Sequence, residues 1–212
     1  MKYYILNKYL AALSGLFLIL FLTGHLLGNL QLLIPDIDIA RVQFNEYAQF
    51  MQSNAFVKIL SYTTYIAIIL HILVTLKLTL DSKRNRSIKY KKIASPTNTL
   101  SSRYMGILGT IILAFLIIHL SDFWYKAKFE GETELYDLII NKFKNINYVI
   151  IYVVSMTAIL LHLLHGFQSS FQSLGLLNSK TRKYIKIIGM TYALIIPILF
   201  AIIPICIYFR VN

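Results

Sequence analysis

Residues 14–31 have the sequence "SGLFLILFLTGHLLGNLQ", an almost unbroken apolar stretch that carries one histidine. A helix needs about 20 apolar residues to cross a hydrocarbon core of about 30 Å. Five runs of this kind occur along the chain, and continuous apolar runs favour helices over the alternating strands of a membrane barrel. The sequence therefore predicts an all-α integral membrane protein with five transmembrane helices, at residues 10–34, 57–80, 104–125, 148–171 and 187–209.

The composition supports a membrane protein and excludes several soluble classes. Of the 212 residues, 57% are hydrophobic, and 21 Lys and Arg stand against nine Asp and Glu. A net charge of +12 would suit a protein that binds nucleic acid, but the bases cluster beside apolar runs, so we exclude that function. The single Cys206 excludes an internal disulfide and a cysteine-ligated metal centre within the chain. Residues 1–212 are expected to form one transmembrane domain.

The distribution of charge predicts the orientation in the membrane. The connections at 81–92 and 178–186 are short and basic, and with the N-terminus and flanking residues they hold 14 of the 21 bases but one of the nine acids. Because basic loops stay in the cytoplasm, we expect a multi-pass protein of the cytoplasmic (inner) membrane with its N-terminus inside and its C-terminus outside. On the outer side we expect an amphipathic helix within 35–53 and an acidic, solvated loop at 130–137.

All five histidines fall inside predicted spans, at His25, His71, His119, His162 and His165. A helix rises about 1.5 Å per residue, which places His25 and His119 roughly 21 and 22 Å from the cytoplasmic edge. By the same measure His71 and His162 lie roughly 14 Å deep, and His165 roughly 9 Å deep. The histidines therefore form two levels, and each level receives residues from two different helices.

Two imidazoles that face each other at one depth suit the axial ligation of haem, because iron satisfies a polar nitrogen in an apolar interior. The chain has no C-x-x-C-H motif, so the sequence predicts two non-covalent b haems. The iron ligands would be His25 with His119 toward the outside, and His71 with His162 or His165 toward the cytoplasm, where the matched depth favours His162. Two alternatives are a haem-free transporter with a histidine-lined pathway, which usually adds intramembrane carboxylates, and a zinc site, which usually gathers four ligands at one level.

Small residues lie beside the histidines. Gly24 and Gly28 flank His25, and Gly15 lies further back along the same span. A porphyrin needs a helix face without bulk, although small residues at this spacing also serve helix packing.

Several motifs together resemble the five-helix, two-haem cytochrome b subunit of succinate dehydrogenase and fumarate reductase (succinate:quinone oxidoreductase). The resemblance covers nearly the whole chain and rests on the opening stretch and on "FNEYAQFM" (44–51), "IILHILVTLKL" (68–78), "SRYMGILGTIILAFLIIHLSDFW" (102–124) and "HLLHGFQSSFQSLGL" (162–176). In that family the haem ligands pair the first helix with the third and the second with the fourth. The family's fourth-helix ligand lies thirteen residues before a glycine, as His162 does before Gly175.

The resemblance also implies a function and partners. The chain is expected to anchor a flavoprotein subunit and an iron–sulfur subunit on the cytoplasmic face, and to pass electrons between them and a membrane quinone, usually menaquinone. It is expected to have no dicarboxylate active site of its own. Arg103, Lys77 and His165 are candidates for contact with haem propionates, and His165 also for a quinone pocket. One departure is Leu160, where some fumarate-reducing members carry a glutamate for proton transfer. A second interpretation is the cytochrome b anchor of another quinone-linked dehydrogenase.

Overall fold

The computed structural model describes residues 2–84 and 100–212, and the side chains of residues 4–84 and 104–212. In this part of the chain every regular element is a helix, and five segments are long and apolar enough to cross a membrane: Tyr4–Leu33, Ala55–Arg84, Tyr104–Glu130, Ile146–Ser173 and Arg182–Val211. This confirms the predicted all-α membrane fold with five spans. The elements are α1 (Lys2–Asn29), η1 (Leu30–Leu33), α2 (Ile37–Ser53), α3 (Ala55–Arg84), α4 (Leu100–His119), η2 (Leu120–Trp124), η3 (Lys126–Glu130), α5 (Leu135–Phe143), α6 (Ile146–Ser173) and α7 (Arg182–Val211).

The spanning helices are longer than the apolar runs that predict them. Helix α3, for example, continues through Lys83 and Arg84, whose positive charges favour the C-terminal end of a helix. Hydropathy marks only the part of a helix that lies in lipid, whereas the backbone hydrogen bonds continue into the polar region. The apolar run therefore locates a span but underestimates the helix.

The third span ends differently from its predicted end. It continues from α4 through the π-helical segments η2 and η3 and stops at Gly131, which adopts the left-handed conformation with φ 72°. The predicted solvated loop then turns out to be partly helical and buried, because α5 begins at Leu135 and Tyr136 is only 2% exposed. Tyr136, Ile139 and Phe143 have the spacing of one buried helix face. The acidic residues between and before them give the stretch the appearance of a solvated loop.

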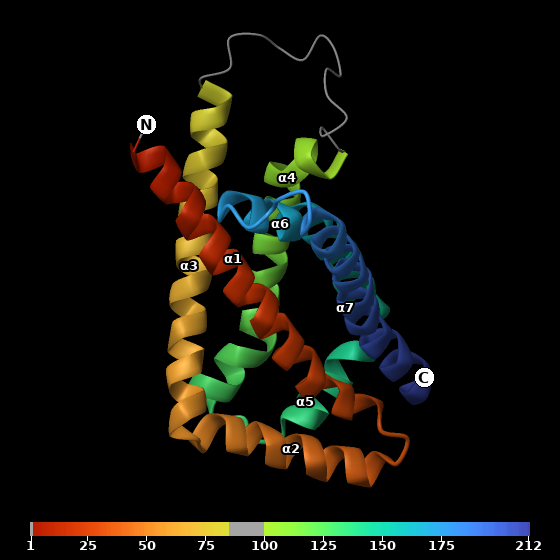
Figure 1. The fold of residues 1–212 in the computed structure, drawn as a ribbon. Helices are drawn as coiled ribbons and strands as arrows, with labels where there is room; N and C mark the ends of the chain where they lie inside the picture. Colours follow the sequence, from red (N-terminus) through yellow and green to blue (C-terminus); the bar gives the residue numbers. More distant parts are fainter. Residues whose placement is uncertain (1, 85–99) are drawn as a thin grey trace.

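The spanning helices form a bundle in which some neighbours pack closely and others do not (Figure 1). Helix α1 packs against α3 and α6, α4 packs against α6, and α6 packs against α7 along much of its length. At Gly189 of α7, an added Cβ would lie 2.6 Å from the ring of Phe167, so the absence of a side chain sets the close approach of α6 and α7.

Helices α2 and α5 form a cap over one end of the bundle, where α2 lies across the ends of the spanning helices (Figure 1). The predicted amphipathic helix is observed as α2, and Asp36 caps it by accepting the N–H groups of Asp38 and Ile39. Its buried Phe44 packs against Tyr136 of α5, with ring centroids 6.5 Å apart. We call this the cap end of the bundle and the opposite end, where α3 and α6 finish, the loop end.

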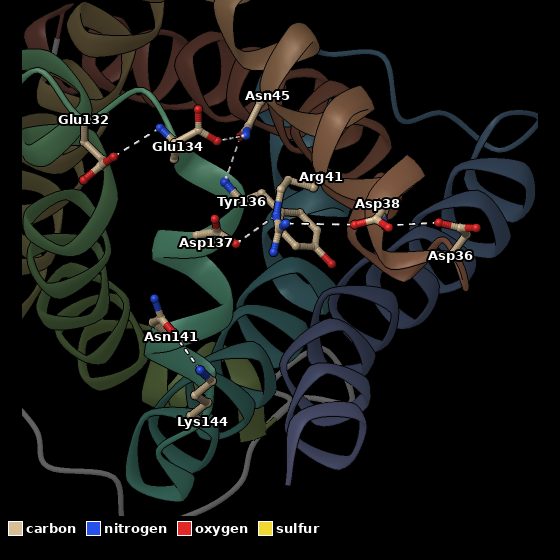
Figure 2. A network of polar contacts seen from close by, with 10 residues as sticks. All are labelled: Asp36, Asp38, Arg41, Asn45, Glu132, Glu134, Tyr136, Asp137, Asn141 and Lys144. Atoms are coloured by element: carbon tan, nitrogen blue, oxygen red, sulfur yellow. Dashed lines mark hydrogen bonds and ion pairs between the residues drawn. The ribbon is translucent and has the colours of Figure 1, made fainter.

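Polar contacts join the two cap helices on their outer side (Figure 2). Asn45 of α2 accepts the backbone N–H of Tyr136 at 3.0 Å and donates to the carboxylate of Glu134. Arg41 pairs with Asp137 of α5 at 3.2 Å. Because Asn45 satisfies an N–H in the first turn of α5, it fixes where that helix begins.

Candidate functional site

Two pairs of histidines lie between helices at different heights of the bundle. Toward the cap end, His25 of α1 and His119 of α4 have ring centroids 5.8 Å apart and ring planes at 85°. Nearer the loop end, His71 of α3 and His162 of α6 have centroids 6.4 Å apart and planes at 74°. We call these the cap pair and the loop pair. The structure thus brings together histidines for which the sequence predicts similar depths in the membrane.

Each pair connects helices that lie across the bundle from each other. Among the described residues, α1 with α4 and α3 with α6 are not closely packed helix pairs, whereas α1 with α3 and α4 with α6 are. The imidazoles of each pair therefore reach toward one another across a wider interhelical space. A flat cofactor between two side chains needs such a space, because closely packed helices leave no voids.

The separation within each pair matches that of two axial ligands on one metal ion. With metal–nitrogen bonds of about 2 Å, two imidazoles on opposite sides of one ion place their ring centroids about 6 Å apart. The observed 5.8 and 6.4 Å lie on either side of this value. A zinc site of four ligands has less support, because no three His, Cys, Asp or Glu side chains of the described residues are grouped to hold a metal ion.

A buried hydroxyl lies beside one ring nitrogen of His71. Ser14 of α1 is 6% exposed, donates its Oγ–H to the carbonyl of Leu10 at 2.7 Å, and lies 3.2 Å from Nδ1 of His71. With its single hydrogen directed at the carbonyl of Leu10, the hydroxyl is able to accept a hydrogen bond from Nδ1–H of His71, and the tautomer of His71 sets the direction of this contact. When Nδ1–H donates, the lone pair of His71 is on Nε2, which is the form that binds a metal ion.

The cap pair lies inside a wall of aromatic rings. Phe21 stacks on His25 with centroids 5.4 Å apart, and Phe115 and Phe123 lie 5.6 and 5.5 Å from His119. The hydroxyl of Tyr152 from α6 lies 3.4 Å from Nδ1 of His119. The rings cover part of both imidazoles, which are half-buried, and the phenol is the only side-chain hydrogen-bond partner of His119 among the described residues.

One buried nitrogen of the loop pair lacks a partner. Nδ1 of His162 is inaccessible to solvent and has no hydrogen-bond partner in the described part of the chain. An unpaired polar atom in an apolar interior costs about 1–3 kcal/mol, so such atoms are rare unless a site is completed by another group. The loop pair therefore fits a site in which a bound group supplies what the chain does not.

Comparison with protein families identifies the chain. A family model described as "Succinate dehydrogenase/Fumarate reductase transmembrane subunit" matches residues 80–201, more than half of the chain. The chain belongs to this family. The match confirms the resemblance carried by the motifs and covers His119 and His162, one member of each pair. No curated protein and no solved structure matches the chain.

The other three residues predicted for the site are His165, Lys77 and Arg103, and the structure describes the side chains of the first two. His165 lies one turn beyond His162 toward the loop end, is partly exposed, and makes no ring contact with His71 among the described residues. Lys77 is exposed on α3. The side chain of Arg103 lies outside the described residues.

An ion pair near the cap pair was not predicted from the sequence. Lys142 of α5 contacts the carboxylate of Asp122 in η2, and its ammonium group lies 4.0 Å from the ring centroid of Tyr148. Burial opposes the charge of Lys142, but the hydrogen bond and ion pair with Asp122 outweigh it and raise the pKa of Lys142 above its ordinary value. The pair joins the cap to the third span at Asp122, three residues, or less than one helical turn, from His119.

Sequence reasoning also missed the hydroxyl partners of the histidines, although one signal was present. Ser14 lies eleven residues before His25, which is close to three helical turns, so both share one face of α1. A serine inside an apolar span on the face of a candidate ligand indicates a buried polar contact. Tyr152 gives no comparable signal, because its contact with His119 depends on how α4 and α6 pack.

Proposed function

We propose that this subunit is a di-haem cytochrome b, which anchors succinate dehydrogenase or fumarate reductase and connects its iron–sulfur subunit to a membrane quinone. The observation that carries the proposal is the separation of about 6 Å within two histidine pairs at two heights of one bundle. The axial ligands would be His25 and His119 at the cap pair, and His71 and His162 at the loop pair. Bound haem supplies a one-electron carrier at each pair.

The chain's own residues orient these ligands. Ser14 contacts Nδ1 of His71, and Tyr152 contacts Nδ1 of His119. Such outer contacts set ring orientation and ligand basicity, and therefore the potential at which a metal ion is reduced. The aromatic rings around His119 give the cap pair a lower local dielectric constant than water has. A net charge at the cap pair therefore costs more free energy than it would at a solvated site.

The loop end is the proposed docking side for the flavoprotein and iron–sulfur subunits. It carries Lys83 and Arg84 at the end of α3, and the basic connection 178–186. These charges also favour a cytoplasmic location in the inner membrane, with the N-terminus inside and the C-terminus outside. We propose His165, Lys77 and Arg103, which belong to the half of the bundle nearer the loop end, as contacts for haem propionates. We also propose His165 as a residue of a menaquinone pocket.

The test of the function is the haem content of the purified subunit. A pyridine haemochrome assay should give two b haems per chain. In the assembled complex, an oxidised menaquinone analogue should reoxidise both reduced haems, so that their reduced absorption bands disappear. A folded chain without haem would contradict the proposal and favour the transporter interpretation. Haem with soluble partners that do not oxidise succinate or reduce fumarate would indicate the anchor of another dehydrogenase.

Cysteine labelling tests the orientation. In a Cys206→Ser background, single cysteines at Ser82 and at Thr133, both exposed, should be labelled by an impermeant maleimide from opposite sides of the membrane. The physical reason is that 14 of the 21 bases lie on the side of Ser82. In intact cells Thr133→Cys should react and Ser82→Cys should react only after permeabilisation. Equal labelling of both in intact cells would contradict the topology.

Charge reversal tests the docking side. Changing Lys83, Arg84 and Arg86 to Glu should weaken retention of the soluble subunits several-fold relative to the wild type at low salt. The difference should be smaller at moderate salt, because salt screens the interaction between exposed charges. Arg86 lies outside the described residues. The matched control reverses three bases toward the cap end, Lys58, Lys126 and Lys128, and should leave retention unchanged. Unchanged retention in the first variant, with its topology intact, would exclude this surface.

A further inference from the structure

The fifth spanning helix, α7, carries no histidine, yet it packs against α1, α5 and α6. Its residues Ala193 and Ile207 are 0% exposed. Most of the rest of α7 is exposed, so these buried positions mark the one face that meets the bundle. The contacts of α7 with α1 therefore raise the question of what it does for the helix that carries His25.

Helix α7 contacts α1 on both sides of His25. On the side of the loop end, the hydroxyl of Tyr192 donates to the carbonyl of Ile19 at 2.5 Å and lies 3.0 Å from Oγ1 of Thr23. At the level of the cap pair, the ring of Phe200 lies 5.7 Å from the ring of His25. Two contacts of α7 thus fix the turn before His25 and the imidazole itself.

A third contact fixes the end of α1. The guanidinium of Arg210 donates from Nη1 to the carbonyls of Leu32 at 3.2 Å and Ile34 at 3.1 Å, and from Nη2 to that of Leu33 at 3.3 Å. These carbonyls close the helical run of α1 and η1, where carbonyls have no partner within the helix. Leu32 is 1% exposed, so water does not replace the guanidinium there.

The direction of this side chain distinguishes it from an ordinary interfacial base. A basic residue near the end of a span usually extends to water and lipid phosphates. Arg210 instead directs two of its nitrogens to three consecutive carbonyls of another helix. A cation at a helix C-terminus is favoured by the helix dipole, and hydrogen bonds from a charged donor are stronger than neutral ones.

We propose that Arg210 is a positioning residue for the cap pair. It fixes the last turns of α1 against α7, and with them the distance and ring orientation of His25 relative to His119. The proposal rests on the proposed function for the haem at that pair, but the position of the His25 turn can be measured without haem. The path from Arg210 to His25 is short, because Leu32 is seven residues, or about 10 Å of helix, beyond His25.

The experiment compares Arg210→Gln and Arg210→Lys with Lys58→Gln, which removes an exposed charge toward the same end of the bundle. One readout is amide hydrogen exchange over residues 22–34, and the other is the midpoint potential and spectrum of each haem. In Arg210→Gln, exchange from His25 onward should be about tenfold faster, and the cap-pair haem should shift its potential while the loop-pair haem does not. Arg210→Lys should restore part of both effects, and Lys58→Gln should resemble the wild type.

Other results would overturn the proposal. Faster exchange confined to residues after Leu32, with an unchanged cap-pair haem, would mean that Arg210 only closes the helix end. Unchanged exchange would mean that the three hydrogen bonds do not hold α1. If the wild type binds no haem, the proposed function fails, whereas exchange at the His25 turn still decides the role of Arg210. If Arg210→Gln does not accumulate, the exchange of Arg210→Lys decides it.

Discussion

His162→Ala will lose the haem of the loop pair and keep that of the cap pair, whereas His165→Ala will keep both. The physical reason is that only one of two histidines three residues apart can direct its ring at His71. The structure places the ring of His162 6.4 Å from that of His71, and within residues 2–84 and 100–212 its buried Nδ1 has no hydrogen-bond partner. In the proposed di-haem subunit, removing this imidazole would leave the loop-pair site with His71 as its single histidine ligand.

The measurement is haem per chain together with the reduced spectrum of each purified variant. We expect His162→Ala to fall from two haems to one, and His165→Ala to shift at most the potential of the loop-pair haem. Because the two changes remove the same side chain one turn apart on one helix, each is the other's control for general damage to α6. One haem in His165→Ala with two in His162→Ala would reverse the assignment.

Gly15→Leu will empty the loop pair without a change to any histidine. A Cβ at Gly15 would lie 3.2 Å from Cε1 of His71 and 3.6 Å from both Nδ1 of that ring and Oγ of Ser170. A single methyl group therefore already requires the ring to move by a few tenths of an ångström, and the branched end of leucine requires more. The ring cannot withdraw without losing the contact of its Nδ1 with Ser14.

A graded series separates this effect from loss of the fold. Gly15→Ala should retain both haems with a shifted potential at the loop pair, while Gly15→Leu should retain only the cap-pair haem. The control is Leu13→Phe, which adds bulk on the same turn at a position that is 56% exposed to the lipid side, and it should keep both haems. Two haems in Gly15→Leu would contradict the prediction and show that the loop pair accommodates a larger side chain at this position.

The five spans and the levels of the histidines are predictable from the sequence, because both depend on properties of a single helix. Apolar length identifies a span, and the constant rise per residue gives the depth of a side chain. For His25 and His119 these rules are sufficient to match the two residues before any packing is known. They fail at α5, since Glu134 just before the helix and Asp137 in its first turn obscure the buried Tyr136.

The surroundings of the histidines are not predictable in the same way, because they depend on how helices are rotated and offset against each other. Tyr152 approaches His119 from α6. Arg210 contacts the carbonyl of Leu32, which lies 178 positions earlier in the sequence. Neither contact has a periodic signal in the sequence. Lys142 and Asp122 likewise meet only because η2 extends the third span toward α5.

The arrangement of the pairs across the bundle has a consequence for biogenesis. Helices α1 and α3 enter the membrane first, and each contributes one histidine to a different pair. The early hairpin of α1 and α3 therefore contains neither pair in complete form. The cap pair becomes complete only when α4 has inserted, and the loop pair only when α6 follows. If each pair holds a haem as proposed, a filled cap pair would require α4 to be inserted and a filled loop pair would require α6, whereas α7 carries no histidine of either pair.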